Sequence, residues 1–147
     1  MNTKSILFYG LLLFSSISFS QDLSKNLFGC ENVTAFKKSR TPDIGIIISS
    51  GDPETVWNAI RLGVYSQGKG DTVVIFVLGK ALDIYMNDTS KFKVHEMSLE
   101  FMMNGGDIYA CATCAKQRNT ENIEYCTITS VADLYEIVKR SKKVLTF

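Results

Sequence analysis

Apolar residues along the chain form short unbroken runs that alternate with segments of helical periodicity. Residues 44–48 (IGIII) and 72–78 (TVVIFVL) are continuous runs rich in β-branched residues, which is typical of strands buried on both faces of a parallel sheet. Between them, apolar side chains recur at helical spacing over residues 56–64. This order predicts one βαβ unit over residues 43–78.

The segment between the first strand and the helix carries the signals of a helix start. Asp52 suits the cap position, Pro53 the first helical position, and Glu54 the positive end of the helix dipole. Gly68 and Gly70 end the segment. The loop does not follow a phosphate-binding frame, and its two carboxylates would repel an anion. We therefore interpret this loop as a helix cap and not as a ligand site.

The rest of the chain continues the alternation of helices and strands. Ser130 and Asp133 follow the capping-box pattern ahead of an apolar periodic run. Two helices are predicted next, a short one over 81–86 and one over 94–103 that ends at two glycines. They are followed by a short strand over 108–110, a short strand over 125–129, a helix after Ser130 and a last strand over 144–147. The pattern predicts an α/β domain over residues 43–147, a three-layer sandwich with a mainly parallel sheet of roughly five strands.

The first 42 residues differ from this pattern. Lys4 precedes an apolar run over residues 6–14, and small residues at 18 and 20 precede Gln21. These features predict a signal peptide over residues 1–20 that is cleaved on export. A membrane anchor would need roughly 20 apolar residues, and serines interrupt this run. We expect an exported, periplasmic protein with no stable membrane anchor, whose residues 21–42 form a polar lead-in.

Charge excludes one class of partner. The chain of 147 residues has 16 Lys and Arg against 15 Asp and Glu, and removal of residues 1–20 takes away Lys4 alone. A general nucleic-acid binder needs an excess of basic residues on one face, so we expect no nucleic-acid partner. Bulk charge is not expected to select a protein partner either.

The strongest candidate for chemistry is the motif Cys111-Ala112-Thr113-Cys114. Cys111 is predicted to lie at the end of a strand and the start of a helix. At such a position the free N–H groups of the helix favour the thiolate and lower the pKa of the cysteine. Lys116 and Arg118 place positive charge nearby. A thiolate can attack a sulfane sulfur and hold it as a persulfide, or exchange with a disulfide.

Other uses of the cysteines stay open. The motif can simply fill the core or form a structural disulfide, and Cys30 can pair with Cys126 or both can be free. A zinc site needs four ligands, and no second pair with suitable spacing exists, so we expect no metal and no bound cofactor. His95 is the only histidine; we expect it to be exposed at the start of its helix, because a base would have to reach Cys111 across the fold.

Three stretches of the sequence resemble the DsrE/DsrF-like proteins of sulfur metabolism. They are IIISSGDPETVWNAIRLGVYSQGKGDTVVIFVLGKAL, NGGDIYACATCAKQRN and TSVADLYEIVKRSKKVLTF, and the likeness covers about residues 43–147. The resemblance implies a DsrE-like fold and a homo-oligomer, a trimer or hexamer. It also implies Cys111 as sulfur acceptor and Cys114 as a resolving partner. The implied partners are sulfur donor and acceptor proteins or small sulfane-sulfur compounds.

The leading hypothesis from the sequence is therefore an exported sulfur carrier or sulfurtransferase that works through a cysteine persulfide. The alternative is a non-catalytic oligomeric binding module whose C-x-x-C motif is a structural disulfide. Thiol–disulfide exchange is a third, weaker reading of the same motif.

Overall fold

The computed structural model describes residues 41–89 and 91–147. The predicted signal peptide, nearly all of the lead-in and Cys30 lie outside the described residues. The described elements, in chain order, are β1 (Ile44–Ile48), α2 (Pro53–Gly68), β2 (Val73–Val77), α3 (Ala81–Met86), α4 (Val94–Met103), β3 (Asp107–Cys111), α5 (Ala112–Gln117), β4 (Thr127–Thr129), α6 (Val131–Arg140) and β5 (Lys143–Thr146).

The strands form one sheet in the order β4-β3-β2-β1-β5, and every pairing is parallel. The α/β class and the parallel sheet predicted from the sequence are confirmed. β4 is shorter than the predicted strand over 125–129. Tyr125 has a φ of 61°, in the left-handed region, so the backbone turns there and pairing begins only at Thr127.

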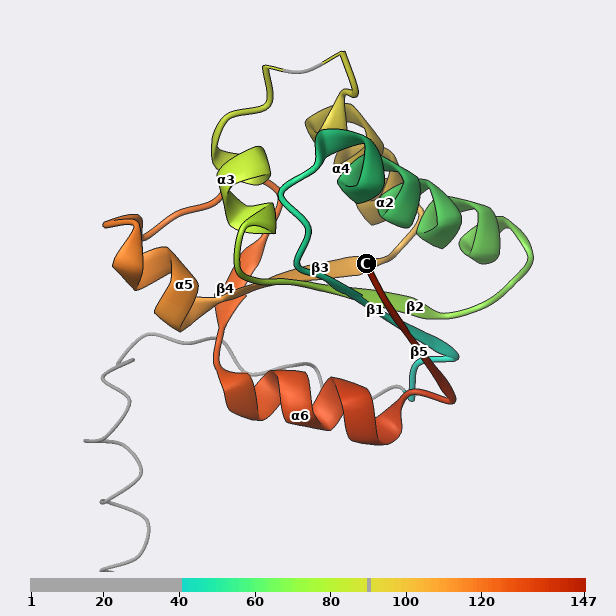
Figure 1. Cartoon of the computed structure of the whole chain (residues 1–147). Coiled ribbons are helices and arrows are strands. Elements are labelled where there is room, and N and C mark those ends of the chain that lie inside the picture. Colours follow the sequence, from blue (N-terminus) through green and yellow to red (C-terminus); the bar gives the residue numbers. More distant parts are fainter. Residues whose placement is uncertain (1–40, 90) are drawn as a thin grey trace, which may run out of the picture. The chain divides into compact units, whose positions relative to one another are not determined.

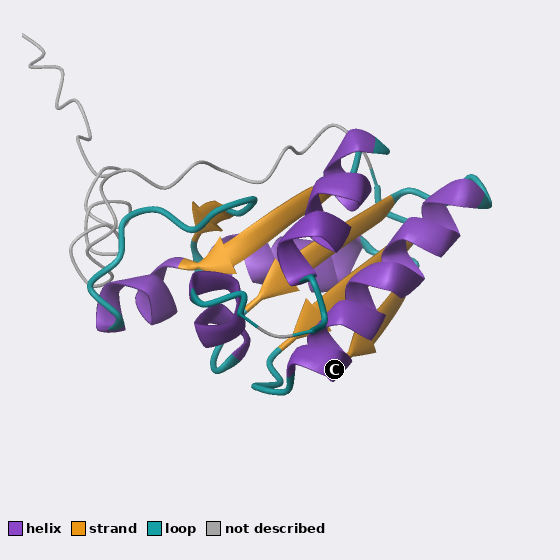
Figure 2. Ribbon diagram, turned by 90° about the horizontal axis from the view of Figure 1, so that it is seen from above, coloured by secondary structure: helices purple, strands orange, loops and turns teal. Residues whose placement is uncertain are grey.

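Helices cover the two faces of the sheet unequally (Figures 1 and 2). α2, α3 and α4 lie over one face and α6 lies across the other. Strand β2 shows how the faces are divided: Val73, Ile75 and Val77 belong to the larger core cluster, whereas Val74 and Phe76 join Ile137 of α6 in a smaller one. All five β2 residues are buried, which explains the unbroken apolar run in the sequence.

The predicted helix caps form. The Asp52 carboxylate accepts hydrogen bonds from the Thr55 backbone N–H at 2.9 Å and from the Thr55 hydroxyl at 2.6 Å. These bonds hold the pKa of Asp52 below its usual range. At α6, the Ser130 hydroxyl accepts a hydrogen bond from the Ala132 N–H. The loop before α2 is thus a cap, as the sequence predicted.

One carboxylate ties together the starting ends of three strands. Asp43 accepts hydrogen bonds from the backbone N–H and the hydroxyl of Thr72, just before β2, at 2.8 and 2.6 Å. The Lys142 ammonium, just before β5, lies 2.6 Å from the other carboxylate oxygen. The Lys142 ammonium and then the Thr72 donors hold the pKa of Asp43 well below its usual range.

Candidate functional site

The cysteine motif lies at the carboxyl edge of the sheet, where two chain segments leave neighbouring strands. β2 runs out through Leu78 and Gly79 into α3, and β3 runs out through Cys111 into α5. In the sheet, Cys111 is in register with Thr129 of β4. Loops at the carboxyl ends of parallel strands are the usual place for ligand chemistry in open α/β folds. The position predicted for Cys111, at the end of a strand and the start of a helix, is confirmed.

Cys111 is half-buried and its side chain packs against the smaller core cluster beside α6. Its backbone is extended, with φ −65° and ψ 115°, and its side chain makes no cap hydrogen bond to α5. α5 is a helix of only six residues. The N–H groups at the start of α5 therefore lie near this sulfur without forming a well-formed cap hydrogen bond.

The electrostatics of Cys111 correct one prediction from the sequence. Burial raises the pKa of the Cys111 thiol above its ordinary value, and the Cys114 sulfur raises it further. The backbone N–H groups of Cys114 and Thr113 act in the opposite direction but do not outweigh burial. The predicted lowering of the pKa is thus wrong in sign, because the sequence pattern could not show how much protein covers this sulfur.

Cys114 has different surroundings. It is also half-buried, but it packs against the larger core cluster, and its Sγ accepts a hydrogen bond from the Gly79 backbone N–H at 3.4 Å. Gly79 has a φ of 58°, in the left-handed region that glycine adopts without steric cost. The turn after β2 therefore places a backbone donor on the second sulfur of the motif.

Arg118 binds the short helix α5 to α3. Its Nε lies 2.6 Å from Oδ1 of Asp83 and its Nη2 lies 2.9 Å from Oδ2, which is a bidentate ion pair. Its Nη1 donates to the carbonyl oxygen of Cys114 at 3.1 Å. The guanidinium lowers the pKa of Asp83, and Asp83 is the main cause that raises the pKa of Arg118.

Sequence reasoning identified Arg118 as a nearby charge but missed its partner Asp83 and the contact of Gly79 with Cys114. Asp83 is 35 residues from Arg118 along the chain, and no local signal in the sequence links Gly79 to the motif. Only the parallel pairing of β2 with β3 brings these residues to the motif. Lys116, the other predicted positive charge, is exposed on α5.

The remaining described cysteine is separate in character. Cys126 packs against the larger core cluster, and burial raises the pKa of its thiol far above the ordinary value. Cys111, Cys114 and Cys126 are all free thiols in the described part of the chain. The pairing of Cys30 with Cys126 stays a prediction, because Cys30 lies outside the described residues.

His95 is half-buried and not exposed as the sequence predicted. Its Nε2 lies 2.7 Å from the carbonyl oxygen of Tyr85, and its Nδ1 lies 3.5 Å from Oε2 of Glu124. The ring also packs against Tyr125, with centroids 5.2 Å apart. These contacts give His95 a structural role: it joins the start of α4 to α3 and to the segment before β4.

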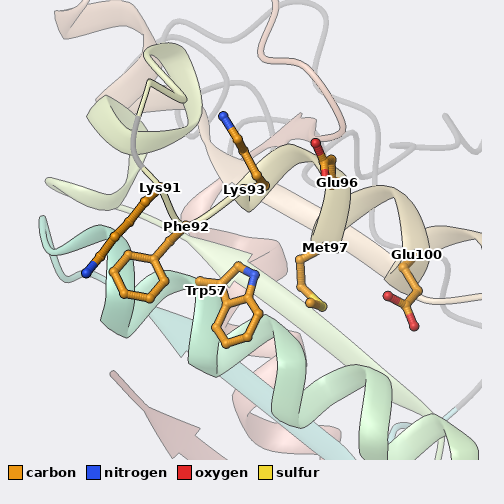
Figure 3. A pocket seen from close by; sticks show the side chains of 7 residues that line it. All are labelled: Trp57, Lys91, Phe92, Lys93, Glu96, Met97 and Glu100. Carbon is orange, nitrogen blue, oxygen red and sulfur yellow. The ribbon is translucent and has the colours of Figure 1, made fainter.

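A groove with a volume of about 310 Å³ lies between α2 and α4 (Figure 3). The rings of Trp57 and Phe92 form part of its wall, with centroids 6.0 Å apart. The other lining residues are charged or apolar: Lys91, Lys93, Glu96, Met97 and Glu100. The groove shares no lining residue with the cysteine pair.

Within residues 41–89 and 91–147, no group of three or more His, Cys, Asp and Glu side chains is arranged to hold a metal ion. In the same part of the chain, every helix is too short or too polar to span a lipid bilayer.

Comparison with known proteins supports the fold. No protein-family model and no curated protein matches the chain. Among solved structures, the ychN protein from E. coli matches with a TM-score of 0.65 and 18% sequence identity, over 72% of this chain and 99% of that one. A conserved protein of unknown function, BT1422 from Bacteroides thetaiotaomicron, matches with a TM-score of 0.62 and 24% identity, over 71% and 95% of the two chains. The chain thus has a DsrE-like fold.

Proposed function

We propose that the pair Cys111 and Cys114 carries sulfane sulfur as a cysteine persulfide, in an exported protein that acts as a sulfur carrier or sulfurtransferase. One observation carries the proposal. Two half-buried thiols lie at the carboxyl edge of the sheet, and one of them, Cys114, accepts a hydrogen bond from the backbone N–H of Gly79 in the turn after the neighbouring strand. The DsrE-like fold and the resemblance in sequence support the same chemistry.

The proposed reaction is a sulfur transfer without net oxidation. A cysteine thiolate attacks the terminal sulfur of a donor persulfide, R–S–SH. A bond forms between the cysteine sulfur and the sulfane sulfur, the donor S–S bond breaks, and R–S⁻ leaves. The products are the protein persulfide and the donor thiolate, so no bound cofactor takes part. Suitable donors are persulfide proteins or small polysulfides, and a second thiol compound or protein accepts the sulfur.

The second cysteine of the motif discharges the persulfide by forming a disulfide. Attack of the other thiol on the cysteine sulfur that bears the persulfide forms the Cys111–Cys114 disulfide and releases the outer sulfur as sulfide. The two cysteine sulfurs are oxidised and the sulfane sulfur is reduced, so electrons balance. Cys111 and Cys114 are three residues apart across the first turn of α5, which supports their proximity.

Homo-oligomerisation, as a trimer or hexamer, is part of the proposal. The outward side of α6 presents Val131, Tyr135 and Val138, which are 62%, 58% and 44% exposed. These residues recur at helical spacing opposite the buried Ile137. An apolar stripe of this kind supports contact with other copies of the chain.

The test is mass spectrometry of the mature protein after treatment with polysulfide. We expect wild type and Cys126→Ser to gain sulfur, and the double variant Cys111→Ser/Cys114→Ser to gain none. Cyanide should then release the added sulfur as thiocyanate. Equal sulfur uptake by the double variant would exclude the motif from the reaction.

A second candidate function rests on the burial of Cys111. A thiol whose pKa is raised by burial also suits a packing role or a structural disulfide in a non-catalytic oligomeric binding module. That function predicts no sulfur uptake. It also predicts an oxidised protein whose melting temperature falls when Cys114 is replaced.

A further inference from the structure

Cys111 and Cys114 differ in the groups that face their sulfurs. Both side chains pack against apolar clusters, which disfavour a thiolate at either sulfur. Gly79 donates its N–H to the Cys114 Sγ at 3.4 Å, whereas the Cys111 side chain makes no cap hydrogen bond to the start of α5. A hydrogen bond to a charged acceptor is stronger than one to a neutral acceptor, so the Gly79 N–H stabilises a thiolate more than a thiol.

Arg118 is anchored to the backbone of Cys114. Three of its N–H groups are held, two by Asp83 and one by the carbonyl oxygen of Cys114. The guanidinium is therefore fixed beside the backbone of Cys114, and not free to swing into solvent as an exposed lysine would. Because Asp83 belongs to α3, which directly follows Gly79, the ion pair also holds α5 against the turn that supplies the N–H.

From this arrangement we infer that Cys114, and not Cys111, is the sulfur that reacts first, and that Arg118, fixed by Asp83, is the residue that positions it. The inference rests on the proposed sulfur-transfer function and reverses the order that the resemblance implied. The Cys114 thiolate attacks the donor R–S–SH, forms the Cys114 persulfide and releases R–S⁻. Cys111 then loses its proton and its sulfur attacks the Cys114 sulfur. The Cys111–Cys114 disulfide bond forms, the bond from Cys114 to the outer sulfur breaks, and the outer sulfur takes up the proton and leaves as hydrogen sulfide.

Burial of Cys111 fits this second role. Its raised pKa keeps it as a thiol at neutral pH, and a thiol next to the Cys114 sulfur does not repel an anion there. Once the persulfide has formed, Cys111 is the neighbouring group that can resolve it. Lys80, at the carboxyl end of β2, interacts with Asp83 and adds positive charge on the same side.

The test is the rate of alkylation of each cysteine by iodoacetamide, followed by peptide mapping, over a range of pH. Only the thiolate reacts, so the rate reports ionisation and access. At neutral pH we expect Cys114 to be labelled about tenfold faster than Cys111 in the wild-type protein. Faster labelling of Cys111 would overturn the inference.

Variants of Arg118 test the positioning role. Arg118→Gln should slow the labelling of Cys114 about three- to tenfold at neutral pH. Arg118→Lys should restore part of the rate. Lys116→Gln removes the same charge from an exposed site on the same helix and should change the rate less than about twofold. Equal effects of Arg118→Gln and Lys116→Gln would show that general charge, and not position, sets the rate.

Failure of this inference can be told apart from failure of the proposed function. Labelling order requires no sulfur donor, so Cys114 can prove the faster thiol in a protein that takes up no sulfur. In that case the proposed function fails and the order of reactivity stands. Sulfur uptake by Cys114→Ser but not by Cys111→Ser would instead keep the function and refute the order. The wild-type labelling order gives a decision even where a variant does not fold.

Discussion

Replacement of Gly106 by alanine tests how tightly the start of β3 is packed. A Cβ at this position would lie 2.2 and 2.4 Å from Cε1 and Cζ of Phe101, and 2.5 Å from Nε2 of Gln67. Carbon atoms in contact normally lie about 3.5–4.0 Å apart. Gln67 can rotate away, at the cost of its hydrogen bond to the Phe101 carbonyl oxygen. The Phe101 ring cannot, because it is fully buried and its other edge faces Gly63.

The magnitude follows from this geometry. Overpacking of a core by one methyl group costs about 1–3 kcal/mol. Because the new atom would clash with a fully buried ring, the cost of Gly106→Ala should lie near or above the upper end of this range. We therefore expect the free energy of unfolding to fall by about 3 kcal/mol and the melting temperature by about 10 °C or more. Urea unfolding followed by circular dichroism measures the first quantity, and a thermal melt measures the second.

A second substitution identifies the cause. Phe101→Leu removes the ring atoms that the new Cβ would meet and costs about 1–3 kcal/mol by itself. The double variant Gly106→Ala/Phe101→Leu should lose less free energy of unfolding than the sum of the losses in the two single variants, by at least about 1 kcal/mol. A double variant whose loss equals that sum would show that the clash with Phe101 is not the cause.

The adjacent glycine is the matched control. A Cβ on Gly105 would meet no atom within 4 Å, but Gly105 has a φ of 85°, in the left-handed region. Gly105→Ala should therefore cost about 1–2 kcal/mol through backbone strain. Phe101→Leu should not relieve it, and the two effects should add within about 0.5 kcal/mol. Rescue of Gly105→Ala by Phe101→Leu, or a Gly106→Ala variant as stable as wild type, would refute the packing argument.

Two further predictions concern strand ends and assembly. The pKa of Asp43 is lower in the folded protein than the unfolded-state value of about 3.9. Its ion pair with Lys142 and its bonds to Thr72 therefore stabilise the fold above that unfolded-state pKa, and this stabilisation is lost as pH falls toward the folded-state pKa. Urea unfolding should therefore show a lower free energy of unfolding for Asp43→Asn than for wild type at neutral pH, and the difference between them should narrow in acid. A difference that stays constant with pH would contradict this. Asp107→Asn, at an exposed site, is the control. Tyr135→Glu on α6 should shift the oligomer seen by light scattering toward smaller species. The control Tyr65→Glu, on α2 and 63% exposed, should not. An unchanged mass of the Tyr135→Glu variant would exclude α6 from the interface.

The surface proposed for assembly and the cysteine pair proposed for chemistry lie on different parts of the molecule. The apolar stripe of α6 is on the face of the sheet opposite α2 and α4 (Figure 1), whereas the cysteine pair is at the carboxyl edge. Cys111 packs against the cluster that includes Ile137, on the inner side of α6. A change in the packing of α6 on the sheet would therefore reach the Cys111 side chain directly, without passing through the larger core.

Local signals in the sequence determined the order and kind of the elements. Unbroken β-branched runs predicted β1 and β2, and Asp52 and Ser130 predicted the starts of α2 and α6, because each signal depends on neighbours within a few residues. The position of Cys111 at the end of a strand, with Cys114 in the helix that follows, was predictable for the same reason. The strand before α6 was predicted too long because nothing in the local pattern reveals the left-handed backbone of Tyr125.

The properties of the sulfur atoms were decided by the tertiary structure alone. Parallel pairing of β2 with β3 brings the Gly79 N–H to Cys114, and Asp83 to Arg118 across 35 residues. Burial against the α6 side raises the pKa of Cys111, where the sequence pattern indicated the opposite. A pKa depends on every group around the atom and on how much water reaches it, and most of those groups come from distant parts of the chain. The sequence alone therefore indicates which atoms can react, and the folded structure decides which of them ionises.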